Sequence, residues 1–231
     1  MRYALYFTPP RHDALTDLAA QWLGRDAFSG EAHATPEAGP FSAEDHANLT
    51  ADPRRYGFHA TLKAPFDLAG SVTENDLIDT VSDFARRTPA FELPELVLGE
   101  LGHFFALIPG SLHPPLQKFA ATVVRSFEPF RAALSEADIA RRKPEGLSAA
   151  ERANLLRWGY PYVMDEFRFH MTLTGPVGRE HQPAVRDLLR ERFSAHIGGP
   201  LAIASIAVFV ERDRGGPFTV HSWLPLAGAQ S

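Results

Sequence analysis

The sequence predicts an α+β protein, and three observations lead to this class. Strand-like and helix-like stretches alternate irregularly with short connections, unlike the regular order of a doubly wound parallel sheet. The 231 residues are 45% apolar and 22% charged, a balance typical of globular proteins. Two octets far apart in the chain are nearly alike, which indicates a duplicated unit. Because no long Gly/Ser linker or block of like charge divides the chain, we expect one domain over residues 1–231.

Short apolar runs that end at Pro or Gly predict the strands. The first run, residues 3–8, is apolar and aromatic and stops at Pro9-Pro10. The second, residues 57–62, is closed by Pro65. The other expected strands cover residues 91–98, 103–108, 167–173, 201–210 and 218–224.

Helical periodicity and capping residues predict the helices. Asp13 is expected to cap a helix that ends near Gly24, with its apolar residues on one face. Thr73 and Asp76 resemble a capping box at the start of a second helix, residues 73–87. Further helices are expected over residues 115–134, 148–158 and 183–193. Residues 25–54 show no clean period, and we expect a loop-rich excursion that covers a site.

Composition and charge exclude several classes of function. The chain has no cysteine, so disulfides, thiolate metal sites and cysteine nucleophiles are excluded. The formal charge of −5 gives no global basic field for long nucleic acid. The apolar run at the N-terminus is too short for a signal peptide, and the longest run, near residues 201–210, is too short for a bilayer span. We expect a cytoplasmic protein that acts on a small molecule and does not bind membranes.

The two octets carry the functional argument. They are FHATLKAP at residues 58–65 and FHMTLTGP at residues 169–176, 111 positions apart and identical at five of eight positions. Side chains two apart in a strand share a face. His59 and Thr61 therefore lie opposite an apolar face, and His170 and Thr172 do the same in the second copy.

Two imidazoles, each beside a hydroxyl, suit transfer at phosphorus. A neutral imidazole can take a proton from the nucleophile, while a protonated one gives a proton to the leaving oxygen. The threonine hydroxyls can bind the non-bridging phosphate oxygens. A lone half-buried histidine more often satisfies a local hydrogen bond, but the repeated context favours a shared catalytic site. Strained cyclic phosphodiesters can react in this way without a metal.

The motifs resemble those of the two-histidine (2H) phosphoesterase superfamily, with all four positions matched: His59, Thr61, His170 and Thr172. The flanking stretches RYGFHATLK, WGYPYV and DEFRFHMTLT resemble a bacterial branch associated with phosphonate-utilisation operons. The resemblance implies two pseudo-symmetric lobes around a central cleft, each an antiparallel sheet with flanking helices. It also implies that the two histidines act as general acid and base on a cyclic phosphodiester. The orientation of the substrate decides which histidine plays which role.

Other residues near the motifs are candidates for substrate binding. Lys63 and Arg168 lie in phase with the histidines and can neutralise phosphate charge, or they are solvated cations at strand ends. The Tyr56 hydroxyl can reach the phosphate or ribose, although strict alternation points it away from His59. Tyr6 and Tyr162 can stack on a base or ribose, but core packing is the favoured interpretation for both. The Arg-Arg-Lys cluster at residues 141–143 can hold a terminal phosphate or form a solvated loop.

The sequence therefore predicts hydrolysis of a small cyclic phosphodiester, of the ribosyl or nucleoside 2′,3′-cyclic phosphate type, with a role in phosphonate metabolism. No cofactor or metal is expected, since the other eight histidines form no H-E-x-x-H or His-x-His pattern. One alternative is an RNA 2′,3′-cyclic-end phosphodiesterase or 2′–5′ ligase, which the acidic charge balance disfavours. Another is a nucleotide- or phosphosugar-binding module without catalysis. The oligomeric state is left open.

Overall fold

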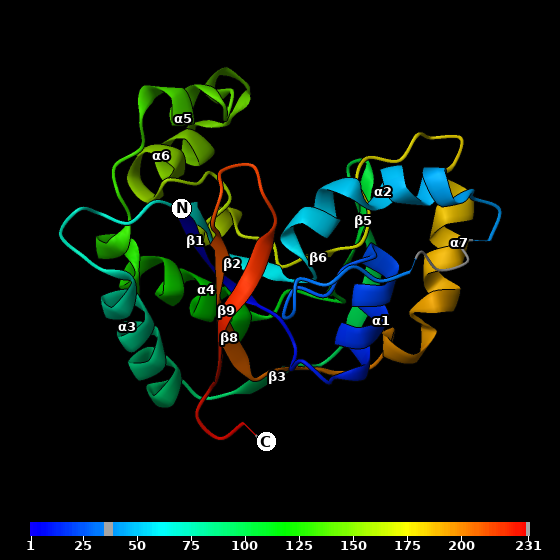
Figure 1. The fold of residues 1–231 in the computed structure, drawn as a ribbon, viewed down its shortest axis with the longest axis horizontal. Helices are drawn as coiled ribbons and strands as arrows, with labels where there is room; N and C mark the ends of the chain where they lie inside the picture. The colour runs from blue at the N-terminus through cyan, green and yellow to red at the C-terminus, as the bar shows by residue number, and fades with distance from the viewer. Residues whose placement is uncertain (35–38, 230–231) are drawn as a thin grey trace.

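The computed structural model describes residues 1–34 and 39–229. Its centre is an antiparallel sheet of seven strands (Figure 1). In spatial order these are β4 (Leu96–Leu101), β5 (Phe104–Pro109), β6 (Met171–Thr172), β2 (Ala60–Phe66), β1 (Arg2–Phe7), β8 (Ser205–Glu211) and β9 (Phe218–Pro225). A second, two-stranded sheet pairs β3 (Phe91–Leu93) with β7 (Leu201–Ile203).

The large sheet has two halves that meet between β2 and β6, where the ladder holds one residue pair, Ala60 opposite Met171. Helices α3 (Glu74–Arg87) and α4 (Pro114–Ser126) lie with the half that contains β1, β2, β8 and β9 (Figure 1). Helices α1 (Ala14–Leu23), α2 (Ala43–Tyr56) and α7 (Gln182–Arg192) lie at the other end. The remaining helices are α5 (Glu136–Ala140) and α6 (Ala149–Trp158). The expected α+β class, with an antiparallel sheet and flanking helices, is confirmed.

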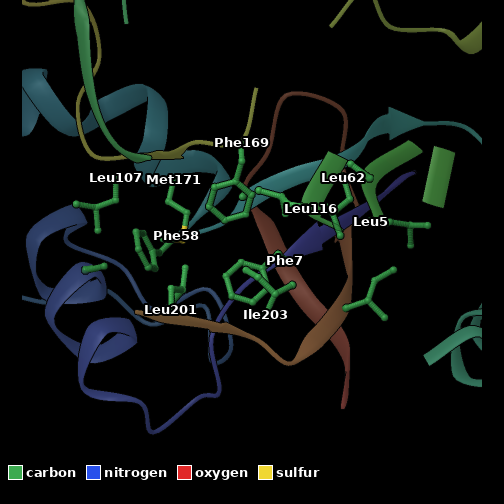
Figure 2. Close-up of a cluster of buried hydrophobic side chains, with 14 of the residues drawn as sticks. Leu5, Phe7, Phe58, Leu62, Leu107, Leu116, Phe169, Met171, Leu201 and Ile203 are labelled. Carbon is green, nitrogen blue, oxygen red and sulfur yellow. The ribbon is translucent and has the colours of Figure 1, made fainter. Parts of the chain in front are cut away.

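The hydrophobic core lies beneath the junction of the two halves (Figure 2). Phe58 and Leu62 enter it from one motif, and Phe169 and Met171 enter it from the other. The ring of Phe7 on β1 lies 5.8 Å from that of Phe169. Burial of each of these apolar side chains contributes about 1.5–3 kcal/mol to the stability of the fold. The apolar faces of both motifs are thus fixed in one core, which directs both polar faces to the other side of the sheet.

Local capping residues place two helices as expected. The Asp13 side chain accepts from the Leu15 amide at the start of α1, and Gly24 ends that helix in the left-handed conformation at φ +77°. Thr73 and Asp76 form both hydrogen bonds of the capping box that opens α3.

The loop expected over residues 25–54 is wrong for its last twelve residues, which belong to helix α2. Residues 35–38 of this stretch lie outside the described residues. The helix opens at a capping box formed by Ser42 and Asp45 and carries Pro53 near its end. A proline in a helix leaves the carbonyl four residues earlier without its helical donor. Here that carbonyl, on Leu49, accepts from the Gly175 amide at 2.6 Å. The helix therefore tolerates Pro53 and is tied to the chain that follows β6.

Several boundaries also differ from expectation, and prolines account for two of them. Pro94 divides the expected strand 91–98 into β3 and β4, which belong to different sheets. The expected helix 115–134 ends at Ser126, just before a single 3₁₀ turn that contains Pro129. The expected strand 201–210 is likewise two strands, β7 and β8.

The two motif strands are also not as expected. The expected strand 57–62 begins later, at Ala60, and runs through Pro65 to Phe66, because a register shift against β1 accommodates the proline. The expected strand 167–173 keeps only the two residues of β6 in the ladder. Among the helices of the described residues, none combines the length and apolar character required to cross a bilayer.

Candidate active site

The two motifs lie side by side on neighbouring antiparallel strands. Ala60 of β2 pairs with Met171 of β6. When this register is continued by one residue in each direction, His59 comes opposite Thr172, and Thr61 comes opposite His170. Directly opposed residues in an antiparallel pair have Cβ atoms about 4.5–5.5 Å apart. The two His-x-Thr motifs therefore lie beside each other at this junction.

Burial of these residues follows the alternation that the sequence predicts. Phe58, Ala60 and Leu62 are buried, as are their counterparts in the second motif, whereas all four His and Thr side chains are partly exposed. The histidines and threonines thus share the face of the sheet opposite the core. The structure brings together the four residues that the sequence proposes as catalytic.

Both imidazoles are held in the same way by the backbone. His59 Nδ1 lies 2.9 Å from the Gly57 carbonyl oxygen, and His170 Nδ1 lies 2.8 Å from that of Arg168. Since a carbonyl oxygen only accepts, each Nδ1 carries the proton and donates it. Each neutral imidazole consequently presents Nε2 as the free base. In the first motif the Thr61 hydroxyl lies 3.3 Å from His59 Nε2.

Gly57 is suited to its place before His59. Its φ of +75° lies in the region that favours glycine. A Cβ atom at this position would lie 2.4 Å from the Cβ of Ala27. The close approach of these two segments thus depends on glycine at the residue whose carbonyl orients the imidazole.

The environment of the two imidazoles favours their neutral form. Burial lowers the pKa of His59 to about 4, with a smaller contribution from the nearby charge of His170 and an opposing one from the Gly57 carbonyl. Burial also lowers the pKa of His170. A bound phosphate anion favours the protonated form of an adjacent imidazole. The site is therefore arranged so that an anionic substrate promotes the protonation that a general acid requires.

Tyr6 is placed differently from the expectation that it stacks on substrate. The residue lies opposite Thr61 on β1, and its side chain is 1% exposed. Its ring stacks on the His59 ring with centroids 3.9 Å apart and an interplanar angle of 24°. Burial raises the pKa of the Tyr6 hydroxyl well above its ordinary value. Tyr6 is thus a support for the imidazole, a role that the alternation of β1 could have indicated.

Lys63 is neither a free cation ready to neutralise phosphate charge nor a solvated cation at a strand end, the two roles that the sequence suggested. It is only 3% exposed, so it is not a solvated cation, and its ammonium group lies 2.8 Å from the Glu128 carboxylate. Burial lowers the pKa of Lys63, while the Glu128 carboxylate acts against this shift. The lysine is neutralised by this partner before any phosphate arrives.

Arg168 and Tyr162 are exposed and line a pocket of about 300 Å³ together with Thr61 and His170. Tyr160 also lines this pocket, and its ring meets that of Tyr162 edge-on at 5.5 Å. We name this the histidine pocket after His170, because His59 and Thr172 are not among its lining residues. Its volume suits a small ligand.

Tyr56 lies near His59, with the two ring centroids 6.0 Å apart. It lines a second pocket rather than the histidine pocket. Among the described residues, no group of three or more His, Asp or Glu side chains is positioned to hold a metal ion.

A family model described as "Protein of unknown function (DUF1045)" matches residues 61–219. A relative from Janthinobacterium sp. (strain Marseille), named Ribose 1,5-bisphosphate phosphokinase PhnN, is 36% identical over 234 residues. The match covers 98% of this chain and 51% of the relative, so the chain spans about half the length of that relative.

Two solved structures are similar over nearly their whole length. TT0787 of Thermus thermophilus has a TM-score of 0.46 and 15% identity, with full coverage of both chains. E. coli LigT, in a complex with ATP, has a TM-score of 0.43 and 15% identity, with 98% of each chain covered. Such low scores support no conclusion about activity. Because the family model matches more than half of the chain, the chain belongs to the family of proteins of unknown function DUF1045.

Proposed function

We propose that the protein is a phosphoesterase that hydrolyses a small cyclic phosphodiester, with His59 and His170 as general acid and base. The observation that carries this proposal is the pairing of the two His-x-Thr motifs across the junction of β2 and β6. Both imidazoles donate from Nδ1 to a backbone carbonyl and present Nε2 on the same face. This pair of bases on one face is more than simple binding of phosphate requires.

In the proposed reaction, one neutral imidazole takes a proton from water through Nε2 as the water oxygen attacks phosphorus. The bond from phosphorus to one ring oxygen breaks, and the other imidazole, protonated, gives its proton to that oxygen. The product is a phosphomonoester with a free hydroxyl, and the two imidazoles have exchanged protonation states. Thr61 and Thr172 donate hydrogen bonds to the non-bridging oxygens, where negative charge increases in the transition state.

For the substrate we propose a ribosyl or nucleoside cyclic phosphate. The relative from Janthinobacterium, which matches 98% of this chain, has ribose 1,5-bisphosphate in its name. That name is consistent with a phosphorylated ribose as the substrate or product of this chain. The resemblance of the flanking motifs to a branch associated with phosphonate utilisation makes phosphonate breakdown the proposed setting. The formal charge of −5 favours a small substrate over long RNA. No metal or cofactor takes part in the proposed steps. We also propose that the protein acts in the cytoplasm.

Phosphorus NMR of the purified protein with cyclic phosphates tests the proposal. The panel contains nucleoside 2′,3′-cyclic phosphates and ribose cyclic phosphates, each with and without EDTA. We expect one ring to open at the same rate in both conditions and to stay closed with His170→Ala. Turnover that EDTA abolishes would contradict the metal-independent reaction. Tight binding without turnover by the wild type would instead indicate a binding module.

A further inference from the structure

A second pocket, larger than the histidine pocket, is strongly basic. Its volume is about 470 Å³. Six arginines line it: Arg2, Arg55, Arg131, Arg141, Arg142 and Arg214. In a chain of net charge −5, this concentration of guanidinium groups marks one place where anions are attracted. We name it the arginine pocket.

The arginines are only partly neutralised by carboxylates. Glu211, which is fully buried, lies 2.5 Å from both Arg2 and Arg55 and also accepts from the Gly215 amide. Glu128 contacts Arg131 at 2.5 Å and Lys63 at 2.8 Å.

The other two carboxylates, Asp67 and Asp138, lie in the pocket wall and contact Arg214 and Arg141. Arg142 has no carboxylate partner among the described residues. The six arginines and Lys63, which shares Glu128 with Arg131, carry seven positive charges. The four carboxylates that contact them carry four negative charges, so three positive charges are left uncompensated.

The arrangement favours a compact phosphoryl group over a diffuse anionic surface. The buried carboxylate of Glu211 holds two guanidinium groups in place, so little side-chain entropy is lost when an anion binds. Guanidinium groups recognise phosphate oxygens in pairs of parallel hydrogen bonds. The volume accommodates a small ligand but not a duplex.

The arginine pocket adjoins the histidine pocket. Gly159 lines the former, and the next residue, Tyr160, lines the latter. The guanidinium group of Arg142 lies over the Tyr160 ring, 4.9 Å from its centroid. On the other side, Tyr56 lines the arginine pocket and its ring lies 6.0 Å from that of His59. The two pockets therefore border each other at Gly159 and Tyr160, on the side of His170.

We propose that the arginine pocket binds a second phosphoryl group of the substrate, a phosphomonoester separate from the cyclic phosphodiester that reacts. This inference rests on the proposed function and narrows its substrate class to cyclic phosphodiesters that carry a further phosphate. The two arginines of the Arg-Arg-Lys cluster, Arg141 and Arg142, line the arginine pocket. Lys143 is exposed and is not among the lining residues, so the proposed phosphate site does not include it.

The test compares a matched pair of substrates, adenosine 2′,3′-cyclic phosphate with and without a 5′-phosphate. We expect the wild type to prefer the 5′-phosphorylated compound by tenfold or more in kcat/KM. The double variant Arg142→Gln/Arg214→Gln should reduce this preference at least tenfold, since hydrogen bonds to a charged group are lost. Lys143→Gln, which removes one charge from the same loop, should retain it. An unchanged preference in the double variant, or no preference in the wild type, would overturn the inference.

A binding experiment separates this inference from the proposed function. Inorganic pyrophosphate is titrated calorimetrically into the wild type, His170→Ala and the double arginine variant. We expect the first two to bind alike and the double variant to bind at least tenfold more weakly. That result supports an anion site even if no cyclic phosphate is turned over. Equal binding by the double variant would overturn the inference whether or not the histidines are catalytic.

Discussion

The neutral state of His59 should make the stability of the protein sensitive to acid. The pKa of the imidazole is about 4 in the folded protein, against 6.5 for the free side chain. Because the folded-state pKa is lowered, the unfolded chain takes up the proton first as the pH falls below 6.5. Stability associated with neutral His59 is thus complete above this pH and is lost as the pH falls towards 4.

The size of the effect follows from these two pKa values. Between pH 7 and pH 5, the free energy of unfolding should fall by at most about 2 kcal/mol on account of His59 alone. Urea unfolding at pH 7, 6 and 5 measures it, with His59→Gln compared to the wild type and His12→Gln as a control for loss of one exposed histidine. The His59→Gln variant should lose less stability over this range. Identical pH dependence in His59→Gln and the wild type would refute the lowered pKa of His59.

Four further substitutions probe the site and its support. Thr61→Val and Thr172→Val should each lower kcat by a factor of about 10²–10³, because each removes a hydrogen bond to the transition state; steady-state kinetics on the substrate identified by NMR would show this, and a loss below threefold would contradict it. Glu211→Gln should destabilise the fold by about 3–5 kcal/mol in urea unfolding, since two arginines lose their buried partner. Stability equal to the wild type would show that this carboxylate is dispensable. Gly57→Ala should lower the melting temperature, because the new methyl group would clash with Ala27; an unchanged melting temperature would mean that the two segments separate without cost.

The motif geometry could be predicted from the sequence because it depends on local alternation. Phe58, His59 and Thr61 are adjacent in the chain, and a strand sends the first to the core and the other two to the opposite face. The caps at Asp13 and Thr73 are equally local. Helix α2 could not be predicted so easily, since Pro53 argues against a helix until the donor from Gly175 is known.

The arginine pocket is not visible in the sequence, because its lining comes from distant segments. Arg2 lies on β1, Arg55 at the end of α2, and Arg214 between β8 and β9. No spacing connects these residues, and only the cluster at residues 141–143 gave a local signal. The buried Glu211 that joins Arg2 to Arg55 lies 209 residues from the first and 156 from the second.

The most direct test of the two-histidine mechanism is the dependence of kcat/KM on pH for the wild type, His59→Ala and His170→Ala. A general base must be deprotonated and a general acid protonated, so the wild type should give a bell-shaped profile. The variant that lacks the base should lose the acid-side limb, and the variant that lacks the acid should lose the alkaline limb, each with most of its activity gone. This pattern would also assign the two roles. Profiles that keep both limbs in both variants, or full activity in either, would contradict the account.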